Sequence, residues 1–369
     1  MMRKTTVYLK NYVGTNYEIG EKIGKWVKKD SQLLKRVTFP TDIYPEKKYK
    51  EIRNMLNEFC PGINEEIEGF ASSLEINPKQ VLFYALTYLE RGCSLMAVLP
   101  SKTKSGHILM GRNYDFNDEI EEMCFAYTDI KGKYKYIGST LNLFGRSDGM
   151  NEHGLAVCKA SNGLPVGNFE GGHQAGVDGF SFWIVLRSIL ENCKDVNEAI
   201  DWVTKAPIAY NINLMLADKN GKIAMIQIID GHIGYKVIQK GSIENYLNCT
   251  NHTTLEKIKP YEKVLIESSV TRNHMIEKMF KEKQLISKKD MKNLLSTCYP
   301  NGLCCHYYKE FFGTLHSMIF DITDNKIEIS FGSPNQNEWQ IFGVEPLVQK
   351  TFNVAVPDEK APNGFYNII

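Results

Sequence analysis

The sequence lacks long apolar runs and any excess of one charge. No apolar stretch approaches the ~18 residues of a membrane-spanning helix. The N-terminal stretch MMRKTTVYLKNYVGTNYEIG lacks the apolar core of a secretory signal. The 44 basic and 43 acidic residues nearly balance, so no global field favours nucleic acid or an anionic membrane surface. We therefore expect a cytoplasmic protein that binds neither nucleic acid nor membrane.

Standard nucleotide and metal motifs are also missing. The glycine-rich stretch at 162–179 contains neither G-x-G-x-x-G nor a P-loop, which favours a loop near an active site or on the surface. The nine cysteines include no paired C-x2-C elements and, without a secretory signal, indicate reduced thiols. The segment CYPNGLCCHYY brings Cys298, Cys304, Cys305 and His306 close together, but its spacing fits no standard zinc motif. We expect an ordinary packed segment there rather than a metal site, and no cofactor.

The chain changes character near residue 92. Residues 1–92 are predicted to be mostly helical, whereas short strands separated by turns follow, with helices interleaved among antiparallel hairpins. This order favours stacked antiparallel sheets covered by helices over a doubly wound parallel sheet. The predicted helices cover 16–29, 46–60, 62–76, 77–90, 180–193, 199–206 and 255–284, and the predicted strands cover 94–100, 106–116, 125–130 and 133–140, with hairpins at 212–230 and 317–332.

A glycine directly precedes a cysteine at Gly92-Cys93, with an apolar strand behind it. Nineteen residues after the cysteine, Arg112 and then Asp115 stand at the far end of the next predicted strand. A hairpin of that length returns its far end beside Cys93. In that position the guanidinium of Arg112 would favour the thiolate form of Cys93, and the carboxylate of Asp115 could hold an ammonium group. An ordinary cross-strand ion pair explains Arg112 and Asp115 equally well.

Several short motifs, in order, resemble the choloylglycine hydrolase and penicillin acyltransferase group of N-terminal-nucleophile hydrolases. They are GRNYDF at 111–116, GMNEHGLAV at 149–157, NCTNH at 248–252 and TLHSMIFDITDNKIEISFGSP at 314–334. Upstream, GTNYEIGEKIGK and NEEIEGFASSLEI are similar to the pro-segment of the acyltransferase branch, the C45 peptidase family. The resemblance covers nearly the whole chain. It implies a four-layer αββα sandwich and a chain that cuts itself before a cysteine.

The resemblance also implies a role for each matching residue. Cys93 becomes the nucleophile, and its freed α-amine, with a pKa of ~8, becomes the base. Gly92 tolerates the strained backbone that lets the thiol approach the preceding carbonyl. The oxyanion site is expected from Asn251 and from Asn162, with Ser161 or a backbone amide as alternatives to Asn162. The remaining active-site residues implied are Arg112, Asp115 and Arg272.

We therefore expect an amidohydrolase made as a precursor. Residues 1–92 form a helical pro-segment that becomes the small subunit, and residues 93–369 form the catalytic αββα domain; the fragments stay associated. The enzyme attacks a linear amide of a small N-acylated substrate to give an S-acyl enzyme, which water hydrolyses. The alternatives are transfer of the acyl group to an amine, a papain-like thiol enzyme with His252 as base, and a non-catalytic binding protein on the same fold. The acyl group, the amine and the oligomeric state stay open, a homo-oligomer included.

Overall fold

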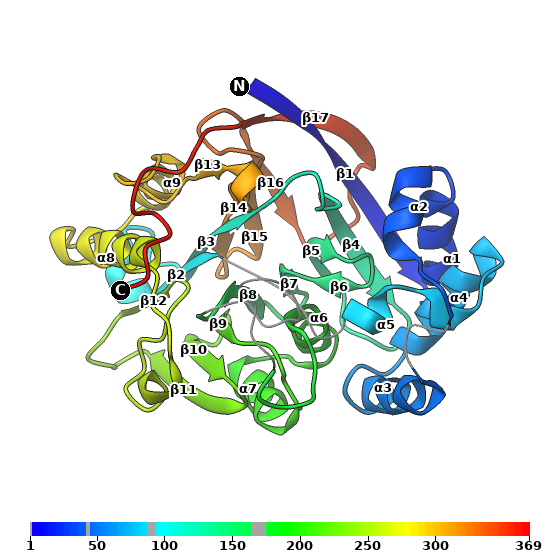
Figure 1. Ribbon diagram of the computed structural model, residues 1–369. Helices are drawn as coiled ribbons and strands as arrows, with labels where there is room; N and C mark the ends of the chain where they lie inside the picture. Colours follow the sequence, from blue (N-terminus) through cyan, green and yellow to red (C-terminus); the bar gives the residue numbers. More distant parts are fainter. Residues whose placement is uncertain (1, 42–44, 87–92, 164–174) are drawn as a thin grey trace.

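Two β-sheets packed face to face form the centre of the molecule (Figure 1). The structure is a computed structural model that describes residues 2–41, 45–86, 93–163 and 175–369. Helices cover the outer face of each sheet, so the layer order is α, β, β, α (Figure 1). The predicted four-layer sandwich is confirmed. No helix among the described residues is long and apolar enough to cross a membrane.

The larger sheet has ten strands within the described residues, in the order β11-β10-β9-β8-β7-β5-β4-β1-β17, with β6 paired to β5. Its pairs are antiparallel except that β1 runs parallel to β4. The strands are β1 (Met2–Gly14), β4 (Cys124–Ile130), β5 (Tyr136–Leu141), β6 (Gly145–Arg146), β7 (Asp148–Asn151), β8 (Ala156–Ser161), β9 (Ile212–Ala217), β10 (Lys222–Ile229), β11 (His232–Gln239) and β17 (Lys350–Pro357).

The smaller sheet has the order β12-β2-β3-β14-β15-β16, with β13 paired to β14. Every pair in it is antiparallel. The strands are β2 (Ser94–Val98), β3 (Leu109–Phe116), β12 (Tyr246–Cys249), β13 (His306–Tyr307), β14 (Phe312–Asp321), β15 (Lys326–Phe331) and β16 (Trp339–Gly343).

The helices divide between the two outer layers. Those packed on the larger sheet are α1 (Asn16–Val27), α2 (Ser31–Val37), α3 (Glu46–Phe59), α4 (Ile63–Leu74), α5 (Phe83–Leu86), α6 (Phe182–Asn192) and α7 (Val196–Lys205). Those packed on the smaller sheet are α8 (Glu267–Glu282) and α9 (Lys288–Ser296). Short 3-10 turns lie at η1 (Pro78–Gln80), η2 (Pro100–Lys102), η3 (Lys259–Tyr261) and η4 (Tyr308–Glu310).

Strand β2 shows how the sequence specifies these layers. Leu95 and Ala97 enter the core between the two sheets, while Met96 and Val98 pack against α8 and α9. Successive side chains of a strand point to opposite faces, so an unbroken apolar run suits a strand buried on both sides. The apolar run around residue 95 therefore places the start of β2 deep inside the molecule.

Most predicted elements are confirmed, with local corrections. The hairpins at 212–230 and 317–332 form, and α6 and α7 lie where they were predicted. The expectation that the first 92 residues are a helical segment is wrong for β1, which lies inside the larger sheet between β4 and β17. The helix predicted over 255–284 is shorter, because residues 259–261 form a separate 3-10 turn before α8. Within 77–90 the described residues form η1, capped by Asn77, and the short α5.

Candidate active site

Cys93 lies immediately before β2 and is completely buried. The predicted hairpin forms, since β2 and β3 pair with Leu95 opposite Arg112. Arg112 Nη2 donates to Cys93 Sγ at 2.8 Å. Gly92, the other half of the predicted cleavage site, lies outside the described residues. The guanidinium predicted to stand beside the thiol is therefore in contact with it.

A buried ion network fixes the orientation of Arg112. Its Nη1 donates to Ser147 O at 2.6 Å and to Asp148 Oδ2 at 2.8 Å. His316 Nε2 lies 2.8 Å from the same Asp148 oxygen. Burial alone would raise the pKa of Asp148, but His316 and Arg112 hold it well below its usual range. Asp148 therefore stays ionised. It binds the Nη1 end of the guanidinium, while the Nη2 end contacts the thiol.

Burial raises the pKa of the Cys93 thiol, and the charges of Arg112 and Lys159 oppose that rise. Lys159 is itself buried, with Nζ 3.6 Å from the centroid of the Phe182 ring. In the uncut chain the thiol is therefore protonated at neutral pH. A base close to Cys93 is needed before the sulfur can act as a nucleophile.

Asp115 has one buried carboxylate oxygen without a partner. Its Oδ1 accepts from Thr314 Oγ1 at 2.7 Å, whereas Oδ2 has no hydrogen-bond partner within the described residues. Burial raises the pKa of this carboxyl, against the opposing effects of Arg272, Thr314 and Arg112. A buried carboxylate with an unsatisfied oxygen is costly unless a donor or a cation joins it. A positively charged group placed beside Oδ2 would offset this cost.

Arg272 of α8 connects the start of β2 to Asn251. Its Nη1 donates to Ser94 Oγ at 2.6 Å, and its Nη2 donates to Asn251 Oδ1 at 2.8 Å. Asn251 Nδ2 in turn donates to Ser161 O at 3.0 Å. The amide of Asn251 is therefore held in one orientation, and its donor already has a partner.

Asn162 is the second predicted oxyanion donor. Its Oδ1 accepts from Thr253 Oγ1 at 3.2 Å, but the buried Nδ2 has no partner in the part of the chain that the structure describes. The neighbouring backbone ties it to the same site, because Gly163 N donates to Asn251 O at 3.0 Å. Of the two predicted asparagines, Asn162 is the one whose amide donor is open to a new acceptor.

His252, the base of the papain-like alternative, points to other groups. Its Nδ1 lies 3.1 Å from Thr250 Oγ1 and 2.7 Å from Ser269 Oγ. Burial, assisted by Arg272, lowers the pKa of His252 to about 4. The described residues provide no hydrogen bond between His252 and Cys93, which weighs against a cysteine–histidine pair.

Sequence reasoning missed the residues that support Arg112 and Asp115. Asp148 lies just before the GMNEHGLAV motif, in S-D-G, where an aspartate usually indicates a turn. Thr314 and His316 begin the motif at 314–334, but nothing local distinguishes them from ordinary strand residues. The pairing of β14 with β3 shows that Thr314 belongs to the site, because it places Thr314 opposite Asp115.

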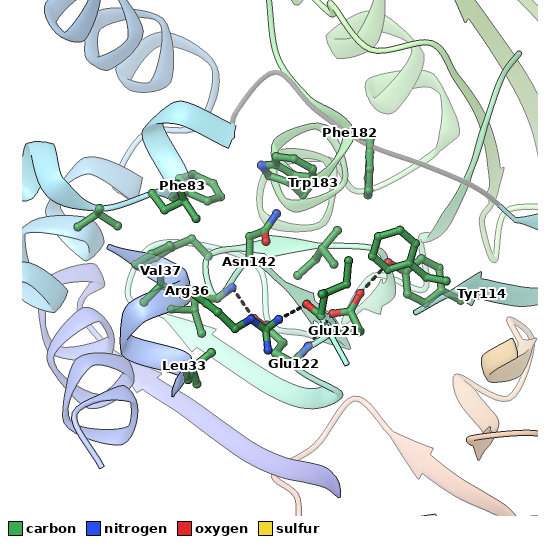
Figure 2. A pocket seen from close by; sticks show the side chains of 17 residues that line it. Leu33, Arg36, Val37, Phe83, Tyr114, Glu121, Glu122, Asn142, Phe182 and Trp183 are labelled. Atoms are coloured by element: carbon green, nitrogen blue, oxygen red, sulfur yellow. Dashed lines mark hydrogen bonds between the residues drawn. The ribbon is translucent and has the colours of Figure 1, made fainter. Parts of the chain in front are cut away.

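A cavity of about 260 Å³ lies close to this site. Figure 2 shows the rings of Phe83, Phe182 and Trp183 along one side of it, with Glu121 and Glu122 on another. Other lining residues come from α2, β3 and the segment after β5, and include Leu33, Arg36, Val37, Tyr114, Leu141, Asn142, Leu143 and Phe144. Residues from both sides of position 92 therefore form one cavity.

Tyr114 lies between the cavity and Arg112, the residue that contacts the thiol. It lines the cavity, and its ring centroid is 5.0 Å from the guanidinium carbon of Arg112. Its hydroxyl donates to Glu121 Oε2 at 2.8 Å (Figure 2). Burial beside Glu122 raises the pKa of Glu121 to about 8, so this carboxyl is mostly protonated at neutral pH.

Comparison with known proteins decides the family. Residues 101–336 match the family model described as acyl-coenzyme A:6-aminopenicillanic acid acyl-transferase. The chain belongs to this acyl-transferase family. The match includes Arg112, Asp115, Asn162, Asn251 and Arg272, and it begins eight residues after Cys93. A search of curated proteins finds no match.

Solved structures similar to this acyl-transferase family member include a bile acid hydrolase and two penicillin acylases. A mutant of the conjugated bile acid hydrolase from Clostridium perfringens is 14% identical, with a TM-score of 0.46, over 73% of this chain and 99% of that chain. Penicillin V acylase from Agrobacterium tumefaciens is 15% identical, with a TM-score of 0.43, over 68% and 86%. Penicillin G acylase from Alcaligenes faecalis is 13% identical, with a TM-score of 0.40, over 54% and 51%.

Proposed function

We propose that the protein is a self-processing cysteine amidohydrolase that cleaves the linear amide of a small N-acylated substrate. One observation carries the proposal: a buried cysteine at the start of a strand contacts an arginine, beside a buried carboxylate with one oxygen that has no partner among the described residues. Cutting the chain between Gly92 and Cys93 would create an α-amine next to the sulfur. An α-amine has a pKa of ~8 and serves as a base near neutral pH.

Each group then has a defined role in acylation. The α-amine takes the proton of the Cys93 thiol, and the resulting ammonium is held by Asp115 Oδ2. The thiolate, stabilised by Arg112, attacks the substrate carbonyl carbon. The negative charge on the carbonyl oxygen is met by Nδ2 of Asn162, a type of contact worth ~3 kcal/mol in the transition state. The C–N bond breaks, and the leaving amine takes the proton from the ammonium.

Asn251 and Arg272 act on the same oxyanion site. Arg272 holds Asn251 by its carbonyl oxygen, which keeps the amide donor directed toward the Ser161–Asn162 backbone. A substrate oxygen that replaces Ser161 O would gain Asn251 Nδ2 as a second donor. Arg272 is then a positioning residue, because its contacts run to Ser94 and Asn251.

The thioester on Cys93 reacts with water to release the carboxylic acid and regenerate the thiol. An amine can attack the same thioester, which makes acyl transfer the second candidate, and membership of an acyl-transferase family favours it. Water needs no binding site of its own, so we favour hydrolysis. A non-catalytic binding protein on this fold would have no use for the Cys93–Arg112 contact.

The cavity indicates the acyl group. Its aromatic and aliphatic walls and the mostly protonated Glu121 suit an uncharged, apolar acyl chain. Its volume of about 260 Å³ lies below the ~300–1,000 Å³ typical of drug-sized ligands, which favours a small group. We propose short or medium apolar acyl chains on an amine.

Intact-mass spectrometry of the purified protein tests the proposal. The wild-type chain should resolve under denaturing conditions into fragments of 92 and 277 residues that remain associated under native conditions. Cys93→Ala should stay at full length, and the matched control Cys193→Ala, at the end of α6, should be cut like the wild type. A wild-type chain that stays whole yet cleaves N-acyl substrates would show that the α-amine mechanism is wrong.

A further inference from the structure

A second cluster of reactive side chains lies in the segment that joins α9 to β14. The Sγ atoms of Cys298 and Cys304 and a ring nitrogen of His306 all lie within 4.8 Å of one another. The loop turns back on itself to bring them together: Cys304 N donates to Thr297 O at 3.0 Å, and Tyr299 N donates to Cys304 O at 2.9 Å. The sequence spacing hides this arrangement, which depends on the fold of the loop.

The groups around the cluster orient its ligand atoms inward. His306 Nδ1 lies 3.2 Å from Glu359 Oε1, while Nε2 faces Cys304 Sγ at 3.4 Å. A histidine that donates one N–H to a carboxylate presents the lone pair of its other nitrogen, which is the usual arrangement of a metal-bound imidazole. Asn335 Nδ2 donates to Cys298 Sγ at 3.1 Å, as an amide does toward a thiolate.

We propose that Cys298, Cys304 and His306 bind a zinc ion. Zn–S bonds of ~2.3 Å and Zn–N bonds of ~2.05 Å in a tetrahedron place sulfur and nitrogen about 3.5 Å apart. The observed separation of Cys304 Sγ and His306 Nε2 is 3.4 Å. Thiolate and imidazole ligands select zinc over magnesium or calcium, which take oxygen ligands.

Ser333 Oγ lies 2.7 Å from His306 Nε2 and 3.4 Å from Cys304 Sγ. Two tetrahedral zinc ligands with bonds of ~2.05 Å would lie about 3.4 Å apart, so the hydroxyl is too close to Nε2 to be a ligand where it stands. The ion would displace this hydroxyl from Nε2, and a water would complete the site. Cys298 is partly exposed, which gives the ion a path from solvent. Binding releases two protons, because both thiols become thiolates, and the two negative charges balance Zn²⁺.

The position of the cluster predicts a structural role. His306 pairs with Gly313 at the start of β14, and the next residue of that strand, Thr314, holds Asp115. Cys305 lies between the cluster and this pair: its amide donates to Thr314 Oγ1 at 2.9 Å, and its carbonyl accepts from Thr314 N at 2.8 Å. Zinc would therefore fix the backbone that orients Asp115, while taking no part in the acyl chemistry.

Metal content of the full-length protein gives the first test. Protein stripped with a chelator, reduced and dialysed against zinc chloride should retain about one zinc per chain, by analogy with other structural sites. Replacement by cobalt should give sulfur-to-cobalt charge-transfer absorption. Cys298→Ser and Cys304→Ser should lose both signals, whereas Cys305→Ser, whose sulfur contacts Leu303 O outside the cluster, should keep them. Glu359→Gln should weaken zinc binding ~10–100-fold.

Thiol alkylation of the wild-type protein provides a second test, which does not depend on whether the cysteine variants fold. Zinc should protect the partly exposed Cys298 from alkylation, and a chelator should remove that protection. The inference is overturned if reduced wild-type protein takes up no zinc, if zinc leaves the alkylation of Cys298 unchanged, or if Cys298→Ser binds as much zinc as the wild type. A Cys298–Cys304 disulfide in the purified protein, with no zinc uptake after reduction, would identify a redox pair instead.

Discussion

Glu121 offers a quantitative test of the cavity that it lines together with Tyr114. The perturbation is Glu121→Gln, which keeps the shape of the side chain and removes its titration. The glutamine Oε1 can still accept from Glu122 N, and its Nε2 can donate to the hydroxyl oxygen of Tyr114. The substitution therefore isolates the effect of charge on a buried wall of the cavity.

The expected magnitude follows from proton linkage. Burial, with a contribution from Glu122, raises the pKa of Glu121 from an ordinary 4.5 to about 8. The folded protein thus holds one more proton than the unfolded chain between these values. The stabilisation that comes from this proton on Glu121 is fully present below pH 4.5. As the pH rises from 4.5 toward 8, the free energy of unfolding falls by ~1.4 kcal/mol per pH unit. Glu121→Gln should remove this slope, a difference of about 4 kcal/mol at most between pH 5 and 8.

Urea unfolding at several pH values measures the difference. Parent and variant should both carry Cys93→Ala, so that each is a single chain, and Glu282→Gln, on an exposed position of α8, serves as the matched control. The free energy of unfolding of Glu121→Gln should exceed that of the parent increasingly above pH 5. If the two profiles run parallel from pH 5 to 8, Glu121 is hydrated and ionised, and the argument for an uncharged acyl cavity fails.

Three further predictions concern the chemistry. Asp115→Asn should lower the turnover of already cut enzyme by ~10²–10⁴-fold with little change in melting temperature, because Thr314 can still donate to the amide oxygen; unchanged turnover with lowered stability would indicate a plain structural ion pair. Val37→Phe, in the cavity wall, should shift preference to shorter acyl chains, whereas Val13→Phe at an exposed position should not; equal chain-length profiles would place the acyl group elsewhere. Adding hydroxylamine or amino acids and following both products separates hydrolysis from transfer: we expect mostly free acid, and diversion of most acyl groups by a natural amine at sub-millimolar concentration would identify an acyltransferase.

Local patterns were sufficient to predict the hairpin that carries the site. The continuous apolar run after Cys93 and the spacing to GRNYDF determine which residues of β2 and β3 face each other. Alternation along a strand repeats every two residues, so the placement of Arg112 beside Cys93 needs only short-range information. The helix over 16–29 was equally readable from the three- and four-residue spacing of its apolar residues, and α1 confirms it.

Long-range pairings could not be predicted from the sequence in the same way. Asp148 and His316 meet across 168 residues, and each alone looks like a turn or strand residue. Cys298 and Cys304 come together because the loop between them turns back on itself, and their spacing in the sequence matched no metal motif. Strand β1 was missed because the partners along both of its edges lie more than a hundred residues away in the chain.

The location of β1 has a consequence for producing the protein. A gene that begins at Cys93 would make the catalytic portion without the strand that joins β4 to β17. Both strands would then present rows of unpaired backbone N–H and C=O groups, and exposed strand edges of this kind template aggregation. Supplying residues 1–92 as a separate polypeptide during refolding offers the missing strand back to both edges at once. If the chain is cut as proposed, residues 1–92 would therefore have to stay in place for the larger sheet to remain whole.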